Sequence, residues 1–224
     1  EPEKQLVYYT VGENAWKSTT VWPPAGHSFR RMWLNSGFRL TSEPPVSHNA
    51  ADEYRVNFEV GSGTSSRWAT QLGGGDVWYA DRAHTDRLLL TYTSKPLAVD
   101  TELTGTAIVT LEYSSTHDDG AIIVYLEDVD ESGYVRMLTE GEIRPLHRVL
   151  GKPYDVVFGP QRSFDSADGR KWPAGEVSHI EFALLPMSVL FRKGHSIRIA
   201  IAGHDKDTFI RTPPAANSVG GPLG

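Results

Sequence analysis

The segment "AIVTLEYS" at Ala107–Ser114 is the clearest indication of the fold. Its apolar and polar side chains alternate, so that Val109, Leu111 and Tyr113 share one face of an extended chain. A period of two residues is typical of a β-strand with one face in a core and the other in water. We therefore predict a half-buried strand here.

Similar short runs, separated by Gly, Pro, Asp and Ser, recur along the whole chain. No comparably long stretch has the i, i+3, i+4 apolar pattern of an amphipathic helix. We expect strands over the following ranges: Leu6–Val11, Arg31–Leu34, Tyr54–Val60, Arg87–Thr93, Thr106–Ser114, Ala121–Asp128, Tyr134–Leu138, Val177–Leu185 and Ser196–Ala202. Many short strands joined by turns predict an all-β fold, a jelly-roll β-sandwich.

The pattern predicts one domain over residues 1–211, followed by a Pro- and Gly-rich tail over residues 212–224. The segment Pro145–Gly175 has few apolar repeats, and we expect an exposed crossover or insertion there. Three aromatic side chains should anchor it to the domain: Tyr154, Phe158 and Trp172.

Composition excludes several classes of protein. The 224 residues carry a net charge of −6 with scattered basic residues, whereas phosphate binding needs clustered Lys and Arg, so we expect no nucleic-acid partner. Cysteine is absent, which excludes disulfides and thiolate metal sites.

No apolar run approaches the ~20 residues of a membrane helix. The beginning, "EPEKQLVYYTV", lacks the basic start and apolar stretch of a signal peptide. We therefore expect a soluble chain without a membrane partner, in a compartment that the sequence does not assign. Because the chain lacks an initial Met and soon enters a strand, we expect a processed product or a piece of a longer protein.

Two Gly-His-Ser stretches resemble the start of a nucleophile elbow, with Ser28 and Ser196 as the candidate nucleophiles. The elbow is G-x-S-x-G and runs from a strand through the serine into a helix. Here Arg30 and Arg198 replace the last glycine, and each serine precedes its strand. We expect neither serine to be catalytic.

The acidic and histidine clusters also favour structural roles. His195 and His204, nine residues apart, would lie roughly 30 Å apart on a continuous strand, so they cannot share a metal ion. Within "DVDESG" at Asp128–Gly133, the EF-hand glutamate is missing from its position, and the flanks predict a β-hairpin. The Asp-Gly of "STHDDG" at Ser115–Gly120 predicts another hairpin turn. We expect no metal and no cofactor.

The glycine-rich segment "LGGGDVWYAD" at Leu72–Asp81 is unusual, because three glycines permit a close backbone approach and an aromatic pair follows. It could line a pocket or a domain interface.

Four longer stretches span the chain nearly end to end: "VYYTVGENAWKSTTVWPP" (Val7–Pro24), "LTYTSKPLAVDTELTGTAIVTLEYSS" (Leu90–Ser115), "VYLEDVDESGYVRMLTEGEIRPLHR" (Val124–Arg148) and "ALLPMSVLFRKGHSIRIAIAGHD" (Ala183–Asp205). In this order they resemble the C-terminal domain of the X-prolyl dipeptidyl-peptidase and cocaine esterase family of serine hydrolases. The chain departs from the family pattern at Ser196, where a second Arg is usual, and at "ATQLGGG", which replaces a Pro-Thr-Gly-Gly segment.

The resemblance implies a non-catalytic, galactose-binding-like jelly roll that packs on an α/β-hydrolase domain and helps to wall its substrate pocket. It implies that the parent protein is an esterase or X-Pro dipeptidyl-peptidase, with the catalytic residues outside this chain. Isolated, such a domain should expose an apolar patch and self-associate. The candidates for a substrate wall or domain interface are Gly73, Gly74, Gly75, Val77 and Trp78. Structural roles at turns are expected of Gly194, His195, Arg198, Arg144 and Arg148.

Two other hypotheses stay open at this point. One is a self-standing carbohydrate-binding module of the same architecture, which would stack sugars on exposed aromatic side chains. The other is a jelly-roll enzyme with its own pair of carboxylates, although the acids around Glu127 alternate onto the wrong face.

Overall fold

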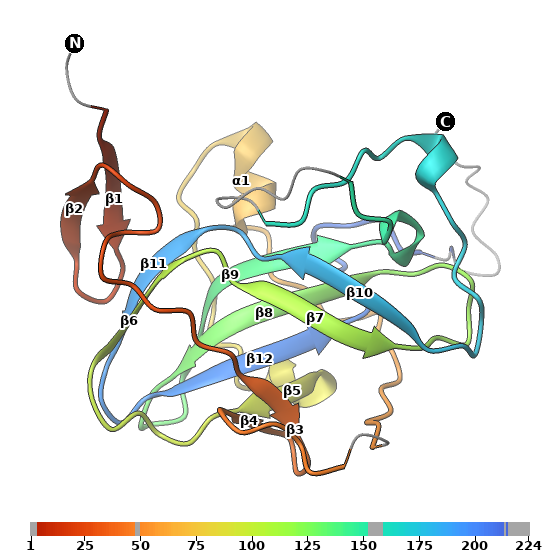
Figure 1. Ribbon diagram of the computed structural model, residues 1–224, viewed down its shortest axis with the longest axis horizontal. Coiled ribbons are helices and arrows are strands. Elements are labelled where there is room, and N and C mark those ends of the chain that lie inside the picture. Colours follow the sequence, from red (N-terminus) through yellow and green to blue (C-terminus); the bar gives the residue numbers. More distant parts are fainter. Residues whose placement is uncertain (1–3, 48–49, 152–158, 213, 215–224) are drawn as a thin grey trace.

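A computed structural model describes residues 4–47, 50–151, 159–212 and 214 of the chain (Figure 1). Twelve strands lie in the described residues, together with one short α-helix. The strands are β1 (Leu6–Thr10), β2 (Ala15–Thr19), β3 (Trp33–Asn35), β4 (Arg39–Thr41), β5 (Leu90–Thr93), β6 (Thr101–Gly105), β7 (Ile108–Tyr113), β8 (Ile122–Val129), β9 (Val135–Ile143), β10 (Ser178–Ala183), β11 (Met187–Phe191) and β12 (Ser196–Ala202). The helices are α1 (Arg67–Gly73) and three 3-10 turns, η1 (Thr85–Leu88), η2 (Pro145–His147) and η3 (Ser166–Asp168).

The larger layer is a six-stranded sheet in the order β3-β4-β5-β12-β8-β9, antiparallel except for the β4–β5 pair. The second layer consists of two antiparallel pairs, β7 with β10 and β6 with β11, which cross over the sheet (Figure 1). The expected all-β sandwich is therefore confirmed.

The main core lies between these layers. Its buried side chains include Val124, Leu126 and Ile197 from the sheet, and Ile180 and Phe182 from β10. The Val109, Leu111 and Tyr113 face of β7, which the alternating pattern identified, packs against this core. Burying each such side chain contributes about 1.5–3 kcal/mol.

A second, smaller core covers the outer face of the sheet. Ile123, Tyr125 and Ala200 point to this side and pack with Val60 and Leu89, which lie outside the strands. As a result, almost every residue of β8 is buried, on both faces of the strand. Residues 54–89, between β4 and β5, therefore act as a cover for the sheet, and this cover carries the site described below.

The structure corrects two expectations and adds elements that were not predicted. Residues 54–60 form no strand: Val60 instead contributes its side chain to the outer core, and Val56 packs close to Gly203. Ser115–Gly120 is not a hairpin turn, because β7 pairs with β10 while β8 lies in the other sheet. Strands β2, β4, β6 and β11 and the helix α1 were not predicted.

The long segment after β9 is anchored as expected at Trp172, which is buried and packs edge-on against Tyr113 with ring centroids 5.1 Å apart. The other two predicted anchors, Tyr154 and Phe158, lie outside the described residues, as does most of the predicted tail. No helix in the described part of the chain is long and apolar enough to cross a membrane.

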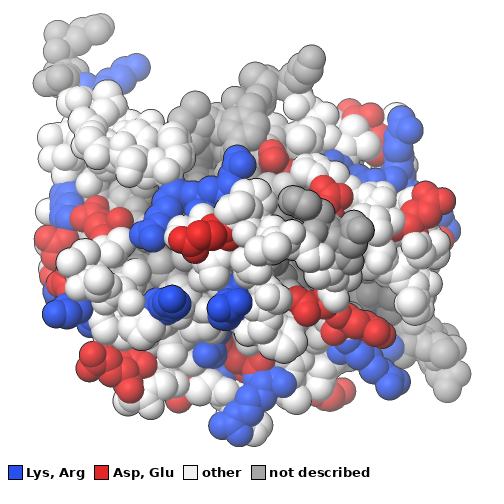
Figure 2. Space-filling model, turned by 60° about the horizontal axis from the view of Figure 1, so that its bottom comes forward, with Lys and Arg blue, Asp and Glu red and all other residues white. Residues whose placement is uncertain are grey.

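Acidic and basic side chains are interspersed on the face shown in Figure 2, without a large region of one sign. This mixed surface agrees with the scattered charges of the sequence.

Candidate functional site

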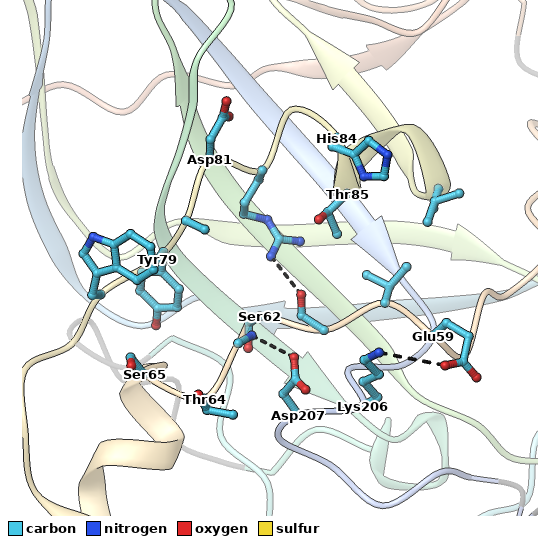
Figure 3. A pocket seen from close by; sticks show the side chains of 17 residues that line it. Glu59, Ser62, Thr64, Ser65, Tyr79, Asp81, His84, Thr85, Lys206 and Asp207 are labelled. Carbon is cyan, nitrogen blue, oxygen red and sulfur yellow. Dashed lines mark hydrogen bonds and ion pairs between the residues drawn. The ribbon is translucent and has the colours of Figure 1, made fainter.

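A pocket of about 520 Å³ opens in the cover of the six-stranded sheet (Figure 3). Three stretches line it: residues 59–65 before α1, part of residues 78–88 after α1, and residues 206–207 after β12. Segments from distant parts of the sequence thus meet at one hollow.

The helix α1 begins and ends on residues suited to these positions. Ser66 caps its N-terminus, because its Oγ accepts a hydrogen bond from the amide of Ala69 at 3.2 Å. Gly74 follows its C-terminus with a φ of 68° and donates its N–H to the carbonyl of Thr70. A positive φ favours glycine, so the chain can turn back toward the pocket there.

The returning segment is held firmly to the sheet. The amide of Trp78 donates to the carbonyl of Ser65 at 2.9 Å, which ties the two sides of the pocket together. Asp81 accepts hydrogen bonds from the amides of Ala83 and Val135, each at 2.9 Å, and these bonds lower the pKa of its carboxyl group. The wall of the pocket is therefore built on a fixed backbone.

The opposite side is fixed by carboxylates at the end of β12. The amide of Ser62 donates to Asp205 at 3.1 Å, and the amide of Gly63 donates to Asp207 at 2.8 Å. Figure 3 shows Asp207 below Ser62, and Lys206 directed toward Glu59. These carboxylates satisfy backbone donors of a loop that has no strand partner.

A buried cluster of charges lies beneath the pocket. The Nε of Arg82 is 2.9 Å from Glu127 and 3.5 Å from Asp86, and Arg198 bonds the other oxygen of Asp86 at 3.0 Å. Arg82, Asp86 and Glu127 are each at most 4% exposed. Two cations therefore compensate two acids and join the cover to the central strands β8 and β12.

Burial also has the largest effect on the pKa values of two side chains in this region. It raises the pKa of Glu127 well above its ordinary value, and the neighbouring charge of Asp86 acts in the same direction. Tyr125 stacks under the guanidinium of Arg82 and donates its hydroxyl to Asp205 at 2.8 Å. Burial raises its pKa well above the ordinary value too, so Tyr125 stays a hydrogen-bond donor.

The predicted interface residues fall into two groups in the structure: exposed apolar side chains and glycines without close neighbours. Trp78 lines the pocket and is 65% exposed, while Val77 is 50% exposed beside it. A Cβ atom at Gly73, Gly74 or Gly75 would meet no other described atom within 4 Å, so these glycines allow no close backbone approach inside the described chain. Gly74 and Gly75 do adopt positive φ, which explains the glycines conformationally.

The predicted turn residues near β12 have the following contacts. Gly194 has a φ of 87° in the turn before the strand. His195 lies 2.8 Å through Nδ1 from Asp128, beside a smaller hollow of about 290 Å³. Arg198 donates through Nε to Thr93 at 2.9 Å.

The arginines after β9 contact neighbouring loops. Arg144 forms an ion pair with Asp119 in the crossover between β7 and β8. Arg148 donates to the carbonyl of Pro145 at 3.2 Å, and its guanidinium lies over the ring of Trp172.

The other motifs have the following positions. Ser196 begins β12 and pairs with Val129, so the strand follows the serine. Residues 130–133 form the turn of the β8–β9 hairpin, where Asp130 accepts hydrogen bonds from Ser132 and Tyr134. Among the described residues, no three His, Asp or Glu side chains could hold a metal ion together.

The sequence interpretation missed the buried cluster. Two signals for it were present: Arg82 and Asp86 stand four residues apart just before a strand, and Glu127 interrupts the apolar run of β8. A charge inside a buried run requires a partner. Asp86 and Glu127 are too deeply buried, and too closely paired with arginine, to act on a substrate as a pair of glycosidase carboxylates.

The fold and these sites define a β-sandwich domain whose polar residues mainly hold its own loops. Residues 1–218 match the family model of the X-Pro dipeptidyl-peptidase C-terminal non-catalytic domain. The chain belongs to this family. This confirms the resemblance in the four sequence stretches and favours the accessory-domain hypothesis over the two others.

Individual relatives also match this chain, over part of their own length. A Mycobacterium bovis protein named as a candidate serine esterase is 45% identical over 223 residues, which cover 97% of this chain and 35% of that protein. The chain thus spans about a third of the length of the curated relatives it matches.

Two solved structures share the fold. An α-amino acid ester hydrolase has a TM-score of 0.71 at 20% identity, covering 93% of this chain and 35% of its own. An aminopeptidase from the marine sediment archaeon Thaumarchaeota archaeon has a TM-score of 0.70 at 20% identity, covering 91% and 35%.

Proposed function

We propose that this chain is the C-terminal accessory domain of a larger serine acyl hydrolase, in which it packs against an α/β-hydrolase domain and forms part of the substrate pocket wall. The observation that carries the proposal is the match of residues 1–218 to a non-catalytic C-terminal domain, together with the 35% of the esterase-named relative that this chain spans. A domain of this kind contributes by position: it shapes the pocket and excludes water, while the reaction takes place on other residues.

The segment after α1 is the best candidate for the wall. Trp78 and Val77 present exposed apolar surface, although their backbone is tied to Ser65 and, through Asp81, to β9. A side chain on a fixed base can keep its place against a substrate without a large entropic cost. Trp78 supplies the larger area, since aromatic side chains bury 150–250 Å² when covered.

Replacing Trp78 by Ala in the full-length protein tests this role. We expect kcat/KM for an acyl substrate to fall about tenfold, because about 1.4 kcal/mol of apolar contact is lost from the pocket. The matched control is Phe29→Ala, since Phe29 is an exposed aromatic residue that does not line the pocket. Equal effects of the two substitutions, or no effect of Trp78→Ala at an unchanged melting temperature, would contradict the wall role.

A further inference from the structure

The hairpin formed by β1 and β2 has an apolar face that stays exposed among the described residues. Trp16 is 72% exposed, Val7 58%, Val11 40% and Tyr9 39%. Figure 1 shows the hairpin beside β6 and β11 at one end of the sandwich, next to the N-terminal end of the chain. A group of exposed apolar side chains on one regular face is typical of an interaction surface.

The register of the hairpin puts these side chains together. Tyr9 lies directly opposite Trp16, and their rings meet edge to face with centroids 5.3 Å apart. Val7 lies opposite Ser18 on the same face, two residues along the strand. The side chains that define this face, Val7, Tyr9, Val11 and Trp16, carry no formal charge, which is the composition of an interface core.

The orientation of the face is fixed by the other side of the hairpin. Lys17 forms ion pairs with Glu13 at 2.5 Å and with Glu102 of β6 at 2.6 Å. Thr10 shares a hydrogen bond of 2.8 Å with Ser188 of β11, and both side chains are buried. These contacts hold the hairpin to the domain, so the Trp16 face points outward and cannot turn inward to bury itself.

Cover from outside would also stabilise the hairpin. A two-stranded hairpin is marginally stable in water, and independent stability needs a third strand or a packed apolar face. The backbone of Val11, just after β1, pairs with β11: its amide donates to Ser188 and its carbonyl accepts from Leu190. Trp and Tyr are also the side chains that contribute most to the centres of interfaces.

We infer that this face, defined by Val7, Tyr9, Val11 and Trp16, is the docking surface for the catalytic part of the same polypeptide. The inference rests on the proposed function. In the M. bovis relative this domain accounts for 35% of the length, and the matched family is a C-terminal domain. The larger part of such a polypeptide therefore joins at the N-terminal side, where the hairpin lies. Because both parts belong to one polypeptide, docking is intramolecular, and a short flexible connection would give an effective concentration in the millimolar range.

Hydroxyl-radical footprinting of the full-length protein tests the inference. Each aromatic residue is compared with the same residue in the denatured protein, which removes differences in intrinsic reactivity. We expect Trp16 to be protected about fivefold or more, as at a fully covered interface core. Phe29 is the internal control, because it is 86% exposed, lies outside β1 and β2, and has its ring against His27. Equal modification of Trp16 and Phe29 would overturn the inference.

A variant pair adds a second readout. In Val7→Asp, which puts a charge on the face opposite Ser18, modification of Trp16 should rise severalfold because docking is weakened. Val46→Asp, at a valine that is 99% exposed outside the hairpin, should leave Trp16 unchanged. An unchanged Trp16 in both variants would contradict docking through this face.

Two controls distinguish this docking surface from a dimer interface and from a failure of the proposed function. Protection of Trp16 that disappears on dilution would assign the face to a second copy of the chain and overturn the inference. The same sample is treated with a fluorophosphonate probe. A labelled serine outside this chain together with an exposed Trp16 would refute the docking surface alone, whereas no labelled serine would refute the proposed function.

Discussion

Substitution of Arg82 by Met is expected to lower the free energy of unfolding by about 3–5 kcal/mol near pH 8. The side chain of Arg82 is buried between Glu127 and Asp86, at 2.9 and 3.5 Å. Its removal leaves two buried carboxyl groups with Arg198 as their remaining cation, so at least one of them is uncompensated. Urea unfolding measures the loss.

The loss of stability in Arg82→Met should be larger at high pH than at low pH. In the folded protein the pKa of Glu127 is raised well above the ordinary value of about 4.3, chiefly by burial. A carboxyl group with a raised folded pKa stabilises the fold below its unfolded pKa and loses that contribution as pH rises through the folded pKa. Removing Arg82 raises this pKa further, so the defect should be largest at pH 8 and smaller at pH 5.

The control for this prediction is Arg87→Met, in the 3-10 turn η1 that follows Arg82. Arg87 is exposed, and we expect a change within about 0.5 kcal/mol. Glu127→Gln in the Arg82→Met background should recover part of the stability, since it removes one unpaired acid. Equal losses for Arg82→Met and Arg87→Met would show that the cluster does not hold the cover to the sheet.

Gly141→Ala is expected to destabilise the domain by about 3 kcal/mol, near the upper end for an overpacked site. A Cβ at this position of β9 would lie 2.4 Å from the carbonyl oxygen of Ala183 and 2.9 Å from the Cα of Leu184. Both are backbone atoms at the point where the chain leaves β10 and passes the edge of the sheet. They can yield only if the two layers separate locally.

Gly120→Ala is the matched control, because a Cβ there would meet no described atom within 4 Å. We expect it to change stability by less than about 1 kcal/mol, and it can be slightly stabilising through the unfolded chain. Thermal unfolding of the two variants in parallel provides the comparison. If Gly141→Ala left stability unchanged, the packing of β9 against the chain that leaves β10 would be looser than the structure indicates.

These cases also show why the sequence predicted the fold better than the site. β7 and β12 have long apolar alternations, so their periodicity was sufficient to locate them, and Ser196–Ala202 was placed with its observed bounds. β6 and β11 are short pieces of the broken second layer and have no such period. Residues 54–60 have apolar side chains but cover the sheet without backbone pairing.

The buried cluster could not be assembled from the sequence, because Arg82 and Glu127 are 45 positions apart and Arg198 lies in a third segment. Only the register of β8 with β12 brings Glu127 and Arg198 to neighbouring positions. Trp78 was singled out because three glycines precede an aromatic pair, and its role at a pocket wall or interface stays a prediction; Gly74 and Gly75 adopt positive φ and so serve backbone conformation. The hairpin face was missed because β2 itself was missed.

Above all, we expect this domain to contribute no catalytic group, so that the reaction takes place elsewhere in the polypeptide. The decisive experiment is to label the full-length protein with a fluorophosphonate probe and to locate the adduct by peptide mass. We expect a single stoichiometric adduct on a serine outside these 224 residues. An adduct within them, above all at Ser28 or Ser196, would show that an activated serine lies in this domain and would refute its non-catalytic role.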